Sequence, residues 1–389
     1  MRNRWSVLAV LFAVRATMAF QFQSVAAVAP LLTGEFGLSI ADIGVLIGLY
    51  FAPGVALALP GGAIGQKFGD RNTVLGALLL MLAGSVTMAL ATSWNIQISG
   101  RLVAGAGGVI LTVQLTKMMT DWFAGKEIAT AMAIFVNSWP AGIAVALLVL
   151  PLIGTGYGVA AVHLGVAAFI VCGIALLATL YRPPPDAAPA STTRLRLDRH
   201  ATLAVVVAGL IWGLFNIGFA IIFSFGPTML VERGWSIAAA ASTISIVLWI
   251  AVFSVPFGGF LADRTKRPQL ILVASSIVFA ALMIALPRSN AVIATVVAIG
   301  MVSGLPAGPI MSLPARVLQP QTRAIGMGLF FTMFYAAMML GPVIGGACAK
   351  WTGSAGAAFD FGAVVILLCP VLLWGFNRIV AGAAVPKAA

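Results

Sequence analysis

Two arginines lie inside long apolar stretches of the chain, where a permanent positive charge is costly. Arg15 falls within the apolar run from Trp5 to Leu32, and Arg101 falls near the start of another run. If a helix enters a membrane at Trp5, its rise of 1.5 Å per residue places Arg15 roughly 15 Å deep, near the midplane. A guanidinium there costs about 2.5–3.5 kcal/mol on the insertion scale and cannot lose its proton. Arg15 must therefore face water, backbone carbonyls or a bound anion.

None of the ten Asp and Glu residues falls near the middle of an apolar run, so neither arginine has a buried carboxylate to pair with. An anion can take that place through charge-assisted, bidentate hydrogen bonds in a low dielectric. The sequence therefore predicts an anion site at Arg15, and the alternative is a structural arginine bonded to carbonyls of a neighbouring helix. Arg101 lies seven residues after Trp94, roughly 10 Å from the end of its span, and the two roles have equal weight for it.

The composition is that of a membrane protein with many spans. Hydrophobic residues make up 61% of the 389 and charged residues only 8%, whereas soluble domains carry about 25% charged residues. Cys172, Cys348 and Cys369 lie in apolar runs without the spacing of a metal site. We therefore expect a lipid bilayer around the chain, and no metal, cofactor or nucleic-acid partner despite the net charge of +12.

Long apolar runs separated by short polar or Gly/Pro segments predict an all-α fold with twelve transmembrane helices. The spans are expected at residues 5–31, 42–64, 73–92, 95–118, 128–152, 157–180, 202–230, 237–262, 269–287, 291–315, 323–349 and 356–379. Twelve crossings put both termini on one side of the membrane. Most of the 22 Lys and Arg residues fall on that side, which the positive-inside rule makes cytoplasmic.

A polar stretch rich in Pro, Ala and Ser, followed by basic residues, divides the chain into six spans and six spans. It reads Arg182-Pro-Pro-Pro-Asp at its start and ends at His200, and this composition is typical of a flexible linker. The expected organisation is a six-helix half, a cytoplasmic linker and a second six-helix half, at residues 1–181, 182–200 and 201–389.

One short pattern occurs in both halves, as in transporters built from repeats. Gly259-Phe-Leu-Ala-Asp263-Arg264 follows span eight, and it resembles the inner-loop motif G-x-L-A-D-R-x-G-R-R of the major facilitator superfamily. The segment after span two is a degenerate copy, with Gln66 where the family usually has Asp. The resemblance covers essentially the whole chain. It assigns conformational gating to residues of these two loops: Gly62, Lys67, Gly69, Arg71, Gly259, Asp263, Arg264 and Arg267.

The resemblance implies two pseudo-symmetric six-helix halves, a central cavity lined mainly by spans one, four, seven and ten, and alternating access by rocking of the halves. It also implies a monomer. Span four, Gly100-Arg101-Leu-Val-Ala-Gly105-Ala-Gly107, is similar to the family's second motif, and we interpret its glycines as close helix packing because no strand precedes them. The antiporter motif of span five is absent, since the chain offers only Asn137-Ser-Trp-Pro-Ala-Gly142. That departure weighs against drug/proton antiport.

Anion porters of the superfamily, including organophosphate, organic-anion, nitrate and cyanate porters, use cavity arginines, and this chain resembles that side of the superfamily. Phe22 shares the Arg15 face at helical period. For the other polar and aromatic candidates the alternative is a helix-packing contact. The predicted substrate-binding residues are Arg15, Arg101, Phe22, Gln23, Tyr50, Gln114, Asn137, Trp212 and Asn216. Three prolines, Pro306, Pro309 and Pro314, predict that span ten is a broken gating helix.

The leading hypothesis is a secondary transporter that moves a small anion, inorganic or carboxylate, across a bacterial-type inner membrane. Inward movement of a monoanion against a negative interior costs about 2.3 kcal/mol per 100 mV, which favours exchange or proton coupling. One alternative is proton-driven efflux of lipophilic drugs, which would require a cavity carboxylate. A second is a membrane sensor without transport. Enzymatic activity is not expected, because no nucleophile, base and metal constellation is present.

Overall fold

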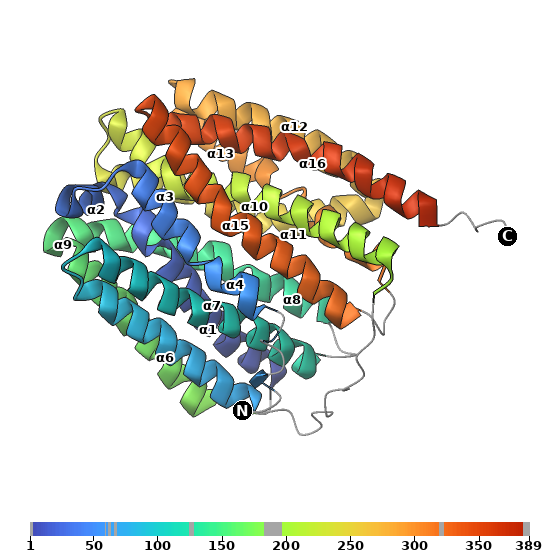
Figure 1. Ribbon diagram of the computed structural model, residues 1–389, viewed down its shortest axis with the longest axis horizontal. Coiled ribbons are helices and arrows are strands. Elements are labelled where there is room, and N and C mark those ends of the chain that lie inside the picture. Colours follow the sequence, from blue (N-terminus) through green and yellow to red (C-terminus); the bar gives the residue numbers. More distant parts are fainter. Residues whose placement is uncertain are drawn as a thin grey trace.

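A computed structural model describes residues 3–58, 60, 64–65, 68–123, 128–182, 197–318 and 323–383. All the regular elements of this part of the chain are helices, and Figure 1 shows the long helices running side by side as one bundle. The elements are α1 (Arg4–Ala27), α2 (Ala29–Phe36), α3 (Ile40–Leu49), α4 (Ala52–Leu57), α6 (Asp70–Ala89), α7 (Trp94–Phe123), α8 (Ile128–Val136), α9 (Ser138–Leu180), α10 (Arg199–Glu232), α11 (Ile237–Thr265), α12 (Pro268–Ala285), η1 (Leu286–Arg288), α13 (Val292–Ser303), α14 (Ala307–Met311), η2 (Pro314–Arg316), α15 (Arg323–Thr352) and α16 (Gly356–Ala383).

Eleven helices of the described chain are long and apolar enough to cross a membrane. One of them, α9, contains two crossings, because Gly158 interrupts it with a φ of 83° that is rare for any other residue. The chain folds back at this point. A Cβ on Gly154 would lie 3.2 Å from Val162, and one on Gly165 would lie 3.3 Å from Ile153, which a straight helix does not allow. The all-α multi-span fold predicted from the sequence is confirmed.

The helices before residue 182 lie together, and so do those after residue 198, as the blue-to-green and yellow-to-red ribbons of Figure 1 show. The two groups meet where α3 packs along α15 and α9 packs along α11, with a smaller contact between α1 and α10. Residues 183–196 of the expected linker lie outside the described residues, so the domain boundaries stay a prediction. We call the end where α1 begins and α16 ends the terminal face, and the other end the opposite face.

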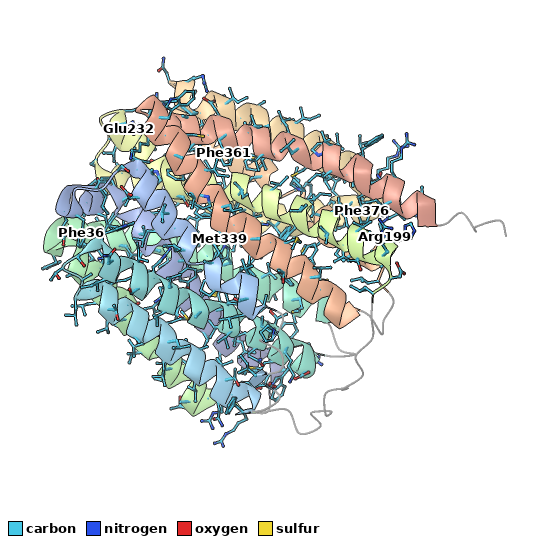
Figure 2. All side chains as sticks on the ribbon, viewed as in Figure 1. Phe36, Arg199, Glu232, Met339, Phe361 and Phe376 are labelled. Carbon is cyan, nitrogen blue, oxygen red and sulfur yellow. The ribbon has the colours of Figure 1, made fainter. Side chains whose placement is uncertain are left out.

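Glycines bring α3 and α15 into backbone contact in the part of the bundle nearer the opposite face. A Cβ on Gly44 would collide with the carbonyl of Pro342, and one on Gly48 would collide with the carbonyl of Met339, which Figure 2 labels on α15. Such approach is typical of packing between transmembrane helices. Within the first helix group, Gly105 of α7 packs against the backbone carbonyl of Tyr50 and Gly108 packs against its hydroxyl, in keeping with the predicted close helix packing.

Span ten is broken as its prolines predict. Helix α13 ends at Ser303, α14 covers only Ala307–Met311, and a 3₁₀ turn, η2, follows at Pro314–Arg316. The break lies against α11, where a Cβ on Gly258 would lie 2.5 Å from the carbonyl oxygen of Leu305. The gating role of this broken helix stays a prediction.

The residues predicted to gate the transporter fall at the terminal face wherever the structure describes them. Gly62 and Lys67 lie outside the described residues. Gly69 precedes α6 with a φ of 78°, and the Arg71 guanidinium donates to the carbonyl of Ala178 at 2.5 Å. Gly259 of α11 lies against Gly308 of α14: a Cβ on Gly308 would lie 2.9 Å from the Cα of Gly259. Asp263 stands near the end of α11, while Arg264 and Arg267 are exposed on both sides of the turn into α12. Their gating role is untested.

Candidate substrate-binding site

Arg15 lies in the middle of α1 and is half-buried. Its Nη1 donates to the carbonyls of Phe135 at 3.1 Å and Val136 at 3.2 Å, and to the hydroxyl of Ser138 at 3.3 Å. These acceptors lie where α8 ends and α9 begins. A helix end leaves carbonyls without an intrahelical partner, and inside a membrane other groups must satisfy them. Arg15 fills that need at the break in span five.

The Nε–Nη2 edge of the guanidinium makes no hydrogen bond within the described chain. All the hydrogen bonds that Arg15 makes within the described chain run through Nη1. Its Nε is buried and has no hydrogen-bond partner among the described residues. Because an arginine carries five N–H donors in a planar fork, the Nε–Nη2 edge can receive a carboxylate or sulfonate side-on. The Phe135 ring, with its centroid 4.8 Å from the guanidinium carbon, holds the plane in place.

A polar side chain from the second helix group approaches this position. Tyr335 of α15 is close enough to Arg15 for an electrostatic interaction, and its hydroxyl hydrogen-bonds the side chain of Thr112 on α7. Tyr335 is buried, with 3% of its surface exposed. Helices from both groups therefore meet around Arg15.

Arg101 is enclosed by carbonyls. Its Nε donates to Leu46 at 2.9 Å, its Nη1 to Gln21 at 3.2 Å and its Nη2 to Phe22 at 2.7 Å, and the side chain has no exposed surface. The Tyr50 ring lies 4.5 Å below its guanidinium carbon. This geometry matches the structural alternative, in which Arg101 ties α1 and α3 to α7. Its predicted role in substrate binding remains untested.

Aromatic side chains from both helix groups form a continuous central aromatic cluster, which we define by the following rings. Phe22 lies 4.9 Å from Phe51, 5.3 Å from Trp139 and 6.1 Å from Phe223, centroid to centroid. Phe51 lies 6.2 Å from Phe334 and from Tyr335, and Phe334 lies 6.3 Å from Trp212. The cluster comprises Phe22, Phe51, Trp139, Trp212, Phe223, Phe334 and Tyr335.

The other predicted residues bond mainly to backbone. Gln23 donates from Nε2 to the Phe223 carbonyl at 2.7 Å, and Asn137 donates to the Val252 carbonyl at 3.3 Å, so both bridge the two helix groups. Asn216 donates to the carbonyl of Trp212 in its own helix. The Tyr50 hydroxyl lies 3.2 Å from Gln21 Oε1, and the buried Gln114 amide lies against Gly65. Of the predicted set, Phe22, Tyr50 and Arg101 touch each other, while Trp212 joins them through the aromatic cluster.

Sequence reasoning missed Phe51, Trp139, Phe334 and Tyr335 as site residues. The only available signal was at Trp139, which stands between Ser138 and Pro140 at the break of span five. The ion pairs of the described residues lie toward the faces, with Lys117 2.6 Å from Asp70 and Arg288 2.7 Å from Asp360, and no described carboxylate pairs with Arg15.

This fold, with polar and aromatic side chains gathered between two groups of transmembrane helices, is that of a membrane transporter. Residues 11–337 match the family described as Major Facilitator Superfamily, which covers most of the chain. The chain belongs to the major facilitator superfamily, whose members are transporters rather than enzymes.

Relatives agree with this assignment. The chain is 31% identical over 141 residues to the inner membrane transport protein YajR of Escherichia coli, a match that spans 36% of this chain and only 30% of that protein. It is 24% identical to the probable sulfoacetate transporter SauU of Cupriavidus necator, over 90% of each chain. A solved structure of a bacterial homologue of the human lysosomal transporter Spinster, inward-facing and occupied, superposes with a TM-score of 0.73 at 19% identity, covering 99% of this chain and 97% of that one.

Proposed function

We propose that this protein is a secondary transporter of a small organic anion, whose carboxylate or sulfonate binds the Nε–Nη2 edge of Arg15. The observation that carries the proposal is the buried Nε of Arg15, which has no partner among the described residues although its Nη1 is fixed by three acceptors. A buried donor left unpaired costs about 1–3 kcal/mol, and more on a charged group. An anion bound at this edge would recover that cost.

The surroundings favour an anion with an apolar or planar body over a bare inorganic ion. The central aromatic cluster reaches Arg15 through Tyr335, which interacts with it, and through Trp139, the neighbour of its partner Ser138; Thr112 and Tyr335 add hydroxyl groups. Binding sites of this kind combine apolar walls with a few polar groups that set orientation. The name of the relative SauU supports the proposal, because the sulfoacetate in that name carries a sulfonate and a carboxylate.

Transport would proceed by alternating access. In the described conformation the backbone contact of α3 with α15 holds the two helix groups together nearer the opposite face. Rocking of the groups would open that contact and make Arg15 accessible from the opposite face. We further propose a monomer in a bacterial-type inner membrane. The terminal face would lie in the cytoplasm, because the sequence assigns most basic residues to the side of the termini.

The charge of the substrate limits the coupling. Moving a monoanion into a negative interior costs about 2.3 kcal/mol per 100 mV. Import then needs an exchanged anion or a co-transported proton, whereas export runs down the potential. Among the described residues, no carboxylate lies beside Arg15 to carry a proton. We therefore favour exchange of one anion for another.

The test is binding and counterflow with purified protein in liposomes. The probes are sulfoacetate, benzoate and nitrate, with a lipophilic cation as the contrasting ligand. A ligand that binds only the folded state raises the apparent melting temperature by mass action. We expect an organic anion to raise the melting temperature of the wild type and to support counterflow, and Arg15→Gln to lose both effects.

Arg233→Gln is the matched control, since Arg233 also donates to backbone carbonyls, of Leu286 and Ser289, but lies away from the site. Arg15→Lys keeps the charge but not the planar fork, and we expect it to bind more weakly. Stabilisation by the lipophilic cation alone, unchanged in Arg15→Gln, would overturn the anion proposal. It would favour the efflux alternative instead.

A further inference from the structure

A second cationic site lies at the terminal face of the later helices, outside the central site. A cavity of about 90 Å³ opens there between α12, α14, η2 and α16. Its polar lining comes from Gln269, Ser312 and Arg316, and Leu272, Leu313 and Leu373 form its apolar base. The volume is about three times the share of one water molecule in the liquid, so it suits a single compact group rather than a nucleotide.

Three side chains hold the polar wall of this cavity in a fixed arrangement. Arg316 Nη1 donates to Asn377 Oδ1 at 3.0 Å, and Gln269 exchanges hydrogen bonds with the same amide at 3.1 and 3.2 Å. The Phe376 ring, labelled in Figure 2 toward the terminal face, lies 5.2 Å from the Arg316 guanidinium carbon. Asn377 and Phe376 therefore hold the Arg316 guanidinium in place, and most of its N–H donors remain for another partner.

That partner is not a carboxylate of the described chain. Arg316 forms no ion pair with any residue that the structure describes. The cavity lining also contains no acidic residue. A guanidinium with a free edge next to an amide donor, with no described carboxylate beside it, matches the pattern that binds phosphate oxygens.

The outward surfaces of the helices that line the cavity indicate where such a phosphate comes from. Trp374 is 64% exposed and Leu270 57% exposed on the outer surfaces of α16 and α12, so these helices present apolar side chains outward. Arg378 lies 5.0 Å above the Trp374 ring. A tryptophan paired with an arginine at the end of an apolar helix is typical of the level of lipid headgroups.

We propose that this cavity, which we call the Arg316 pocket, binds a phosphate group, supplied by the headgroup of an anionic phospholipid in the adjoining leaflet. Arg316 and Gln269 donate to the phosphate oxygens, and the acyl chains lie along the outward surfaces of α12 and α16. The pocket includes Pro309 and Ser312 of the broken span ten, so an occupied pocket holds this span against α12 and α16. The proposal is independent of the anion transported at Arg15.

Native mass spectrometry of the full-length protein, released from detergent with added lipid, tests the proposal. The lipid probes are phosphatidylglycerol, phosphatidylcholine and diacylglycerol, which share acyl chains and differ in the headgroup. We expect phosphatidylglycerol to bind at least tenfold more tightly than diacylglycerol, and Arg316→Gln to remove most of that difference. Gln269→Leu should weaken the same binding several-fold, because it removes the amide donor and leaves the charge.

Arg378→Gln is the matched control, since it removes a neighbouring arginine that does not line the pocket. A loss of phosphatidylglycerol binding as large in Arg378→Gln as in Arg316→Gln would overturn the proposal, because it indicates diffuse charge attraction. Equal binding of diacylglycerol and phosphatidylglycerol would overturn it as well. A different outcome identifies inorganic phosphate as the ligand that the site takes: in that case it raises the melting temperature of the wild type but not of Arg316→Gln, and phosphatidylglycerol does not bind. This result would support the phosphate site and assign it to free phosphate.

Discussion

The carbonyl of Met339 on α15 occupies the place where a side chain on Gly48 of α3 would begin. Because a backbone carbonyl cannot move aside as a flexible side chain can, we expect Gly48→Ala to push the two helices apart. Overpacking of this kind costs about 1–3 kcal/mol. The apparent melting temperature in detergent should fall by several degrees, as measured by intrinsic fluorescence.

Gly76→Ala is the control for the Gly48 substitution. Gly76 lies in the helix α6, and a Cβ there would meet no atom within 4 Å. Alanine is favoured over glycine inside a helix by about 1 kcal/mol, so this variant should be as stable as the wild type or more stable. Equal melting temperatures for both variants would show that α3 and α15 are less closely packed than described.

The multi-span helical fold could be predicted from the sequence, because long apolar runs separated by short polar segments mark its helices, and Arg15 does lie inside one of these helices. The hydrogen-bond acceptors of Arg101 could not be predicted. Its three acceptors are the carbonyls of Leu46, Gln21 and Phe22, and every residue has a carbonyl, so no pattern marks them. Only the crossing of α1, α3 and α7 brings them together.

Phe22 and Trp212 of the central aromatic cluster were predicted as site residues, but its other members were not assigned, for a physical reason. Lipid tails are as apolar as a protein core, so hydrophobic periodicity does not separate the buried from the outward face of a transmembrane helix. Phe223 is 2% exposed and Phe253 is 76% exposed, yet both stand in similar, mainly apolar sequence and both precede a serine. The same ambiguity left Tyr335 and Trp139 unassigned.

Arg101→Lys distinguishes a structural arginine from a substrate-binding one. Lysine keeps the charge but cannot reach the carbonyls of Leu46, Gln21 and Phe22 in one plane. We expect a loss on the order of 3 kcal/mol, because buried acceptors lose charge-assisted hydrogen bonds. The yield of monodisperse protein and its melting temperature should fall well below those of Arg15→Lys. A variant with wild-type stability that no longer binds the anion would instead place Arg101 in the substrate site.

Lys117 bridges Asp70 at the start of α6 and Asp121 on its own helix, at 2.6 and 3.0 Å. The Lys117 and Asp70 side chains are 37% and 23% exposed, so their pair should contribute no more than about 1 kcal/mol. A double-mutant cycle with Lys117→Met and Asp70→Asn, read by melting temperature, should show that coupling. It should shrink in 1 M NaCl, where the screening length falls to about 3 Å. A coupling that is unchanged by salt would indicate a pair shielded from solvent.

Gln23 links the two helix groups through its hydrogen bond of 2.7 Å to the Phe223 carbonyl, in a fully buried position. If the groups separate when the opposite face opens, this bond must break, so Gln23→Leu should favour opening. A loss of about 1 kcal/mol, typical of one hydrogen bond, corresponds to roughly a fivefold change in the equilibrium. The reporter is a single cysteine, Thr33→Cys, in the cavity of about 210 Å³ between α2, α3 and α10.

The rate at which a membrane-impermeant thiol reagent modifies this cysteine measures the opening, in a background where Cys172, Cys348 and Cys369 are serine. Gln97→Leu is the matched control, since Gln97 is also buried and donates to a carbonyl, that of Met88, within one helix group. We expect Gln23→Leu to raise the rate several-fold and Gln97→Leu to leave it unchanged. Equal rates in both variants would mean that the Gln23 bond persists through opening, and that the groups move apart elsewhere along α3 and α15.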